Sequence, residues 1–137
     1  MWSSKVSLES LTEMQPGTLP GTFGLRPVAV SEGRMTMEME LQPWMMAPNG
    51  YLHAAAHITL ADTCAGYATR AHMPDGAKGF TTLELKSNFL GTAREGVLRV
   101  EAVAEHLGRT SQVWSATVFD SNGRKLSLFR CSQIILW

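Results

Sequence analysis

The chain has 137 residues, enough for one compact domain with an ordinary hydrophobic core. Twelve Lys and Arg balance twelve Asp and Glu, so no overall field favours nucleic acid or an anionic membrane. The two cysteines form neither a metal-ligand spacing nor a disulfide framework. The opening MWSSKVSLES lacks an apolar signal core, and no apolar run is long enough to span a bilayer. We therefore expect a cytoplasmic protein with no nucleic-acid or membrane partner.

The first third of the chain predicts a short helix, two strands and a loop. KVSLESLTEM at residues 5–14 fits a short amphipathic helix, and the prolines and glycines after it mark residues 1–21 as an N-terminal extension. A strand is expected over residues 22–30. The alternation of RMTMEMEL at residues 34–41 predicts a second strand. Two prolines, an asparagine and a glycine then mark residues 43–50 as a loop.

The most informative segment is LHAAAHITLADTCAGYATRAH at residues 52–72. It is rich in alanine, contains no proline and stops before Met-Pro-Asp-Gly, a strong helix terminator. Its apolar residues fall on nearly every side of a helix, which predicts a helix buried all round. No other segment of the sequence predicts a long helix.

The rest of the chain reads as four strands, over residues 80–89, 96–106, 111–119 and 125–136. Leu-Gly-Arg and Asp-Ser-Asn-Gly provide turn signals before the last two of them. We expect these four strands to form a meander. The order of elements predicts an α+β fold, in which one antiparallel sheet curls around a buried helix in a single domain over residues 1–137.

The segment GYLHAAAHITLADTCAGYA at residues 50–68 resembles the helix signature of hotdog-fold thioesterases. In that family a His-Gly-Gly opens the helix and an acid follows nine residues after the His, as Asp62 follows His53 here. The run FLGTAREGVLRVEAVAEHLGRTSQVWSATVFDSNGRKLSLFR is similar to the strand half of the family, so the likeness covers residues 22–136. The branch it resembles is the phenylacetate-pathway (PaaI-like) acyl-CoA thioesterases. The resemblance implies hydrolysis of an acyl-CoA, with CoA as part of the substrate and no cofactor.

Three features depart from the family pattern. Ala54 and Ala55 stand where glycines are usual. Six residues before the His, members often carry an Asn or Gln that helps hold the thioester, but here the residue is Ala47. Asn49 is a nearby substitute that could contact the substrate. Four residues after the acid, Gly66 replaces the usual Ser or Thr.

The resemblance places the chemistry at the start and the middle of the helix. Helix N-termini offer unpaired N–H groups, and the N–H of Ala54 is the candidate donor to the thioester oxygen, with Ala55 beside the substrate. Asp62 is the candidate catalytic carboxylate, either a general base or a nucleophile. Its alternative is a structural role, bonded to a backbone N–H or to Arg70. His53 either contacts the substrate or caps the helix.

Two further positions rest mainly on the resemblance. Thr81 lies where related enzymes place a hydroxyl near the scissile bond; an ordinary strand threonine is the alternative. Arg109 matches the family's turn that approaches the CoA phosphates; a solvated arginine is the alternative. Three weaker candidates for the phosphates are Lys86, Arg94 and Arg130. The other histidines have no second ligand at metal spacing, so we expect core or surface positions for them and no metal. These are His57, His72 and His106.

The spacing of the two main candidates has a consequence for assembly. Ala54 and Asp62 are eight residues apart in the sequence, or about 12 Å along a helix at ~1.5 Å per residue. A thioester carbon must lie ~3–3.5 Å from its reacting groups, so it cannot meet both within one chain. We therefore expect a homodimer with shared active sites, or a tetramer made of two such dimers. A non-catalytic acyl-CoA-binding module is the alternative function, although a binder has no need of a carboxylate at this position.

Overall fold

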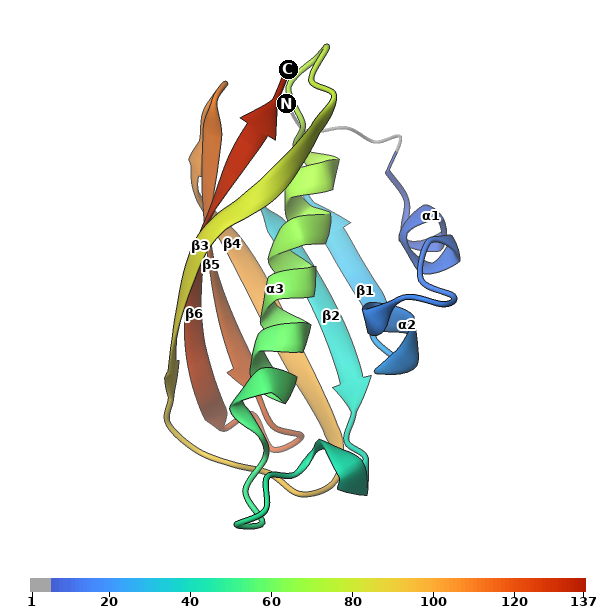
Figure 1. The fold of residues 1–137 in the computed structure, drawn as a ribbon, viewed down its shortest axis with the longest axis vertical. Coiled ribbons are helices and arrows are strands. Elements are labelled where there is room, and N and C mark those ends of the chain that lie inside the picture. The colour runs from blue at the N-terminus through green and yellow to red at the C-terminus, as the bar shows by residue number, and fades with distance from the viewer. Residues whose placement is uncertain (1–5) are drawn as a thin grey trace.

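A single long helix, α3 (Ala54–Ala71), lies in the hollow of a six-stranded antiparallel sheet in the computed structural model, which describes residues 6–137 (Figure 1). Two short helices, α1 and α2, lie beside β1, and a 3-10 turn, η1, follows β2. The α+β hotdog architecture expected from the sequence is confirmed. The other elements are α1 (Leu8–Glu13), α2 (Leu19–Thr22), β1 (Arg26–Ser31), β2 (Arg34–Glu40), η1 (Pro43–Met45), β3 (Gly79–Phe89), β4 (Val97–Leu107), β5 (Ser111–Phe119) and β6 (Lys125–Leu136).

The strand order is β1-β2-β4-β5-β6-β3, so the expected four-strand meander is wrong for its first strand. β4 pairs with β2, whereas β3 pairs with β6 and forms the edge opposite β1. The reason is the path of the chain between β2 and β3. α3 carries the chain across the face of the sheet, and the long connection at residues 90–96 then brings it back past the start of α3 to β4 (Figure 1). Of the four strands after α3, β4, β5 and β6 follow one another as hairpins.

The N-terminal boundary of the first strand also differs from the prediction. The strand expected over residues 22–30 begins at Arg26, because residues 19–22 form the helical turn α2. Pro20 occupies the first turn of α2, where the missing N–H costs nothing. Gly24 then takes a φ of +70°, which a residue with a side chain rarely adopts, and the chain turns into β1.

One hydrophobic cluster joins the helix to the sheet. On α3 it includes Leu60, Cys64 and Ala68, and on the sheet it includes Leu98 and Trp114, all fully buried. The expectation that the helix is buried on every side is wrong. The side of α3 that carries the candidate acid is half-buried in this chain, because β3 covers only part of it; these residues are Ile58, Thr59, Asp62, Thr63 and Gly66.

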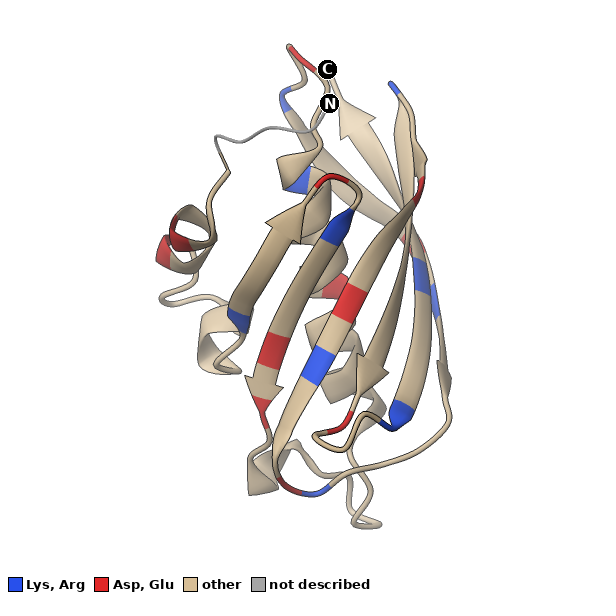
Figure 2. Ribbon diagram, turned by 180° about the vertical axis from the view of Figure 1, so that it is seen from behind, with Lys and Arg blue, Asp and Glu red and all other residues tan. Residues whose placement is uncertain are grey.

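The outer face of the sheet carries charged side chains together with exposed apolar ones such as Leu128 and Leu136. Basic and acidic residues both occur along its strands (Figure 2). This distribution agrees with the formal net charge of zero. None of the helices within residues 6–137 is long and apolar enough to cross a membrane.

Candidate functional site

The start of α3 is held by a tight loop. The N–H of Ala47 donates to the carbonyl oxygen of Tyr51 at 2.7 Å, which closes the loop on itself. The N–H of Leu52 donates to Oγ1 of Thr92 at 2.8 Å, which fixes the loop to the connection between β3 and β4. Two segments far apart in the sequence therefore position the first turn of the helix.

Two of the residues expected to contact the substrate brace this loop. Oδ1 of Asn49 accepts the N–H of Tyr51 at 3.1 Å. Nε of Arg94 donates to the carbonyl oxygen of Gly50 at 2.8 Å, and its guanidinium lies 5.6 Å from the centre of the Tyr51 ring. In this chain both side chains serve the loop that leads into α3.

The first turn of α3 leaves one backbone donor free. His53 is the N-cap: its Nδ1 accepts the N–H of Ala55 at 2.9 Å, and its carbonyl oxygen accepts the N–H of Ala56 at 2.9 Å. The N–H of Ala54 has no hydrogen-bond partner in the described part of the chain. The capping role of His53 is thus the one seen here, and the donor expected at Ala54 is available to a ligand.

A cavity of about 410 Å³ opens beside this helix start. One wall comes from the loop and the first turns of α3, and the other comes from the end of β3, the connection after it and the turn before β6. The lining is mainly apolar and aromatic, with one histidine and one arginine. The lining residues are Tyr51, Leu52, Ala54, His57, Phe89, Leu90, Gly91, Thr92 and Arg124.

His57, for which the sequence predicted a core or surface position, is the histidine that lines this cavity. It is 2% exposed, its Nδ1 lies 3.1 Å from Oγ of Ser127, and its ring meets the ring of Phe89 edge-on at 5.1 Å. Burial lowers the pKa of His57, which favours the neutral imidazole. His57 lies four residues after His53, so the helical period alone predicts that both side chains lie on the same side of the helix. The opposite wall, which includes Phe89, depends on pairing between β3 and β6 and left no local signal.

Asp62 lies half-buried in the middle of α3. Its Oδ1 is buried and has no hydrogen-bond partner among residues 6–137, and neither ion pair found in that range involves Asp62 or Arg70. The structural alternative, a bond to Arg70, is therefore not seen. Burial raises the pKa of the Asp62 carboxyl. Burial and then the charge of Asp62 raise the pKa of Cys131, on β6, to about 12.

The structure does not bring Ala54 and Asp62 together. Asp62 is absent from the lining of the cavity that Ala54 borders. The helix between them is unbroken, so the separation of about 12 Å stands. Within one chain, the free donor and the free carboxylate therefore belong to different places.

On β3 the residues that face the helix differ from the expected one. Thr81 and Thr82 are both exposed but lie on opposite faces of the strand: Thr81 pairs with Ile134, and Thr82 donates its hydroxyl to Oε1 of the buried Gln133 at 3.0 Å. A bulge between Thr82 and Glu84 shifts the register, and farther along the strand Oγ of Ser87 is buried without a hydrogen-bond partner among the described residues. A bulge that reverses the alternation is not visible in the sequence.

Arg109 lies at the opposite end of α3 from Ala54. Its guanidinium lies 4.0 Å from the centre of the Trp137 ring, and Nε1 of Trp137 donates to the carbonyl oxygen of Arg109 at 3.2 Å. The turn that holds it is close to the helix C-terminus, since Nε2 of Gln112 donates to the carbonyl oxygen of His72 at 2.8 Å. Within one chain Arg109 is therefore far from the start of α3.

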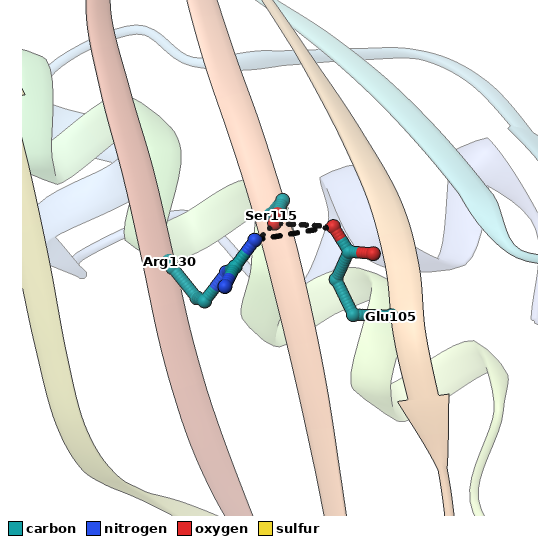
Figure 3. Close-up of polar contacts among 3 residues, drawn as sticks. All are labelled: Glu105, Ser115 and Arg130. Carbon is teal, nitrogen blue, oxygen red and sulfur yellow. Dashed lines mark hydrogen bonds and ion pairs between the residues drawn. The ribbon is translucent and has the colours of Figure 1, made fainter.

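The two cations left among the phosphate candidates lie away from the helix. Arg130 takes part in a polar cluster on the outer face (Figure 3): Nε of Arg130 donates to Oγ of Ser115 at 3.1 Å, and Oγ of Ser115 donates to Oε2 of Glu105 at 2.7 Å. An ion pair of 3.6 Å joins Arg130 to Glu105. Lys86 stands opposite Arg130 in the strand register. No three His, Cys, Asp or Glu side chains in residues 6–137 gather as metal ligands would.

Comparison with known proteins places the chain in a family. A family described as the thioesterase superfamily matches residues 49–127. The 1,4-dihydroxy-2-naphthoyl-CoA hydrolase of Escherichia coli (strain K12) is 30% identical over 139 residues, 99% of each chain. The proofreading thioesterase EntH of Klebsiella pneumoniae is 27% identical over 135 residues, 98% of each chain.

Solved structures agree with the sequence comparison. The crystal structure of a mutant thioesterase from Pseudomonas aeruginosa superposes with a TM-score of 0.92 at 27% identity, and the match covers 98% of this chain and 97% of that one. The phenylacetate-pathway branch expected from the motifs stays a prediction. The chain belongs to the thioesterase superfamily: it has the hotdog fold and is a thioester hydrolase.

Proposed function

We propose that this protein hydrolyses an acyl-CoA at a site shared by two subunits, with Asp62 of one chain facing the helix start of the other. The observation that carries the proposal is the Asp62 carboxylate, whose buried Oδ1 has no partner within residues 6–137. Buried polar atoms in folded proteins are almost always satisfied. A ligand, a water molecule or a partner subunit is the natural source of the missing contact.

The chemistry follows from the two free groups. The N–H of Ala54 donates to the carbonyl oxygen of the thioester and stabilises the negative charge that forms there; one such donor is typically worth ~10²–10³ in rate. Asp62 takes the proton of a water molecule as that water attacks the carbonyl carbon, or attacks the carbon itself and forms an anhydride that water then cleaves. In either case the C–S bond breaks, and CoA leaves as the thiol once its sulfur is protonated.

Exposure along β3 supports the shared site. β3 is an edge strand of 11 residues that pairs only with β6, and Leu83 within it is 65% exposed. A long free edge normally needs a partner or a cover. A two-fold axis along this edge would cover the half-buried side of α3 and place Asp62 near the partner's cavity. It would also bring Arg109, at the other end of α3, near the site of the partner subunit.

The named relatives support a CoA thioester as the substrate. Those of Escherichia coli and Listeria monocytogenes are 1,4-dihydroxy-2-naphthoyl-CoA hydrolases. The cavity beside Ala54 has room and aromatic walls for an acyl group or for the pantetheine arm of CoA. We also propose that the reaction needs no cofactor, since Asp62 and Ala54 provide the base and the donor. Two free, buried cysteines fit the reducing cytoplasm as the location.

The test is release of free thiol from a panel of acyl-CoAs with short, long, aromatic and hydroxylated acyl groups. Asp62→Asn should lower kcat at least ~100-fold on the best substrate, as expected for loss of a base or nucleophile. Asp75→Asn, an exposed Asp outside the site, is the matched control and should keep wild-type activity. If Asp62→Asn turned over at the wild-type rate, Asp62 would not be the catalytic group. Binding of acyl-CoA without any turnover would favour the non-catalytic module.

Mixed dimers test whether the site is shared. Ala54→Trp blocks the helix start, and Asp62→Asn removes the acid, so each homodimer should be inactive. In a mixed dimer one site has both lesions and the other has none, so activity should recover to about half that of the wild type. Verified mixed dimers without recovery, together with a normal melting curve for Ala54→Trp, would place each site within one chain.

A further inference from the structure

His57 and Ala54 face the same cavity from successive turns of one helix. Both residues line the space of about 410 Å³ at the start of α3. Helical side chains lean towards the helix N-terminus, so a side chain at position 57 covers the turn that contains residue 54. A ligand bound at the free N–H of Ala54 therefore lies within reach of the His57 ring.

The contacts of the ring decide which nitrogen can act on that ligand. Nδ1 of His57 lies 3.1 Å from Oγ of Ser127, a residue that is 1% exposed. No other acceptor for the Ser127 hydroxyl is found in the described part of the chain, so we assign this hydroxyl as the donor and Nδ1 as the acceptor. The proton of the neutral imidazole is then on Nε2. That N–H has no hydrogen-bond partner among residues 6–137.

The ring is held in one orientation. The hydroxyl of Ser127, on β6, fixes one side of it, and Phe89, at the end of β3, meets it edge-on at 5.1 Å. Because burial lowers the pKa of His57, the imidazole stays neutral near pH 7. A fixed neutral ring with one free N–H recognises a hydrogen-bond acceptor and is indifferent to cations.

We propose that His57 contacts the substrate, its Nε2–H donating to a carbonyl oxygen of the bound thioester. The inference rests on the proposed function, since it takes the cavity beside Ala54 as the place where the thioester binds. An acyl-CoA offers two kinds of carbonyl there: that of the thioester and those of the pantetheine amides. A contact with the thioester oxygen would add a second donor to the N–H of Ala54, whereas a contact with an amide would position the arm of CoA.

Three variants separate the hydrogen bond from the shape of the ring. His57→Phe keeps a flat ring and removes both nitrogens, so kcat/KM for benzoyl-CoA should fall about 10-fold, the size of one hydrogen bond to substrate. His57→Gln restores an N–H at a similar reach and should recover most of that loss. Ser127→Ala removes the group that keeps the proton on Nε2 and orients the ring, so it should lower kcat/KM by about 3-fold, less than His57→Phe does. A loss that Gln fails to recover would count against the hydrogen bond.

A second substrate tells the two carbonyls apart. S-ethyl thiobenzoate has the thioester carbonyl and no pantetheine amide. Equal losses for His57→Phe on benzoyl-CoA and on S-ethyl thiobenzoate, seen in kcat, would identify the thioester oxygen as the acceptor. A loss on benzoyl-CoA alone, seen in KM, would identify an amide. Wild-type values on both substrates, from a variant with a normal melting curve, would overturn the proposal. If the Phe variant does not fold, His57→Leu takes its place.

Binding of phenacyl-CoA, a thioether that keeps a carbonyl and resists hydrolysis, separates this inference from the proposed function. If the wild type hydrolyses benzoyl-CoA and His57→Phe matches it in both assays, the inference fails and the function stands. A second outcome is a wild type that hydrolyses no acyl-CoA, while His57→Phe binds phenacyl-CoA about 10-fold more weakly than the wild type does. In that case the function fails and the contact stands. A wild type that hydrolyses no acyl-CoA of the panel and does not bind phenacyl-CoA overturns both.

Discussion

The two ends of α3 differ in how their polar groups are satisfied. At the C-terminal end, Nδ1 of His72 lies 2.7 Å from the carbonyl oxygen of Ala68, and its Nε2 accepts the N–H of Gly33 at 2.8 Å. The carbonyl oxygen of His72 accepts a hydrogen bond from Nε2 of Gln112. The His72 ring packs edge-on against Trp114, with the ring centres 5.1 Å apart. This end ties α3 to the β1–β2 turn and to β5.

From its start to its middle, the same helix leaves polar groups open. The N–H of Ala54, Nε2 of His57 and Oδ1 of Asp62 all lack a hydrogen-bond partner in the part of the chain that the structure describes. Of these three groups Oδ1 of Asp62 is buried, and an unsatisfied buried group costs stability unless something else binds there. The comparison teaches that one histidine, His72, belongs to the scaffold, whereas the other, His57, faces the ligand.

The largest effect on stability is expected at the satisfied end. His72→Ala removes the acceptor of the Gly33 N–H and leaves a void beside Trp114. It should lower the free energy of unfolding by about 3 kcal/mol. Urea denaturation measures this, and the folded fraction should keep the wild-type kcat. His106→Ala, at an exposed histidine, is the control and should stay within about 0.5 kcal/mol. A large loss of kcat in folded His72→Ala would contradict the assignment of His72 to the scaffold alone.

A smaller effect, of opposite sign, is expected at Asp62. Burial raises its pKa in the folded state above the ordinary 3.8. The protonated carboxyl therefore supports the fold fully below pH 3.8, and this contribution is lost as the pH rises through the raised pKa. Asp62→Asn is neutral at every pH, so it should melt above the wild type at pH 8, by on the order of a few degrees.

The gap between Asp62→Asn and the wild type should close as the pH approaches 4, where both side chains are neutral. Asp75→Asn, at an exposed Asp, should show no such gap at either pH. The same titration should appear in catalysis, since the reaction needs the carboxylate: kcat/KM of the wild type should fall as the pH drops through the raised pKa. A variant less stable than the wild type at pH 8 would mean that Asp62 has a structural partner in solution.

The smallest effect is expected at Ser87, whose buried Oγ has no hydrogen-bond partner in residues 6–137. Ser87→Ala removes an unsatisfied hydroxyl and should change the free energy of unfolding by less than about 0.5 kcal/mol, in either direction. Ser127→Ala, which removes the partner of His57, should cost about 1 kcal/mol. A loss above 1 kcal/mol for Ser87→Ala would reveal that a second subunit satisfies this group, and would place Ser87 at the interface.

Local signals in the sequence predicted most of the fold. Alanine content and the terminator after residue 72 defined α3 to within two residues at its start and one at its end. Alternation located the strands, and Asp-Ser-Asn-Gly located the turn before β6. The spacing of His53 and Asp62 pointed to the helix that carries the free donor and the free carboxylate. These features depend on residues close together in the chain, so the sequence contains them directly.

Long-range pairing accounts for what the sequence did not predict. β3 pairs with β6 instead of β4, and nothing within either strand specifies that choice. The bulge near Leu83 turns Thr82 towards the buried Gln133 in place of Thr81. The cavity wall opposite His57 combines Phe89 with Arg124, which are distant in the sequence. Site residues on the helix were therefore predictable, whereas those on the facing sheet were not.

The position of β6 between β5 and β3 has a consequence for biosynthesis. Of the six strands, β6 is translated last, yet it is the one on which β3 pairs. Until it leaves the ribosome, β3 has no neighbour in the sheet, and the apolar side of α3 that β6 covers stays open to chaperones and to other nascent chains. Ser127, whose hydroxyl lies 3.1 Å from Nδ1 of His57, also arrives with it. A nascent chain released before β6 would thus lack the hydroxyl that contacts His57 as well as the strand that pairs with β3.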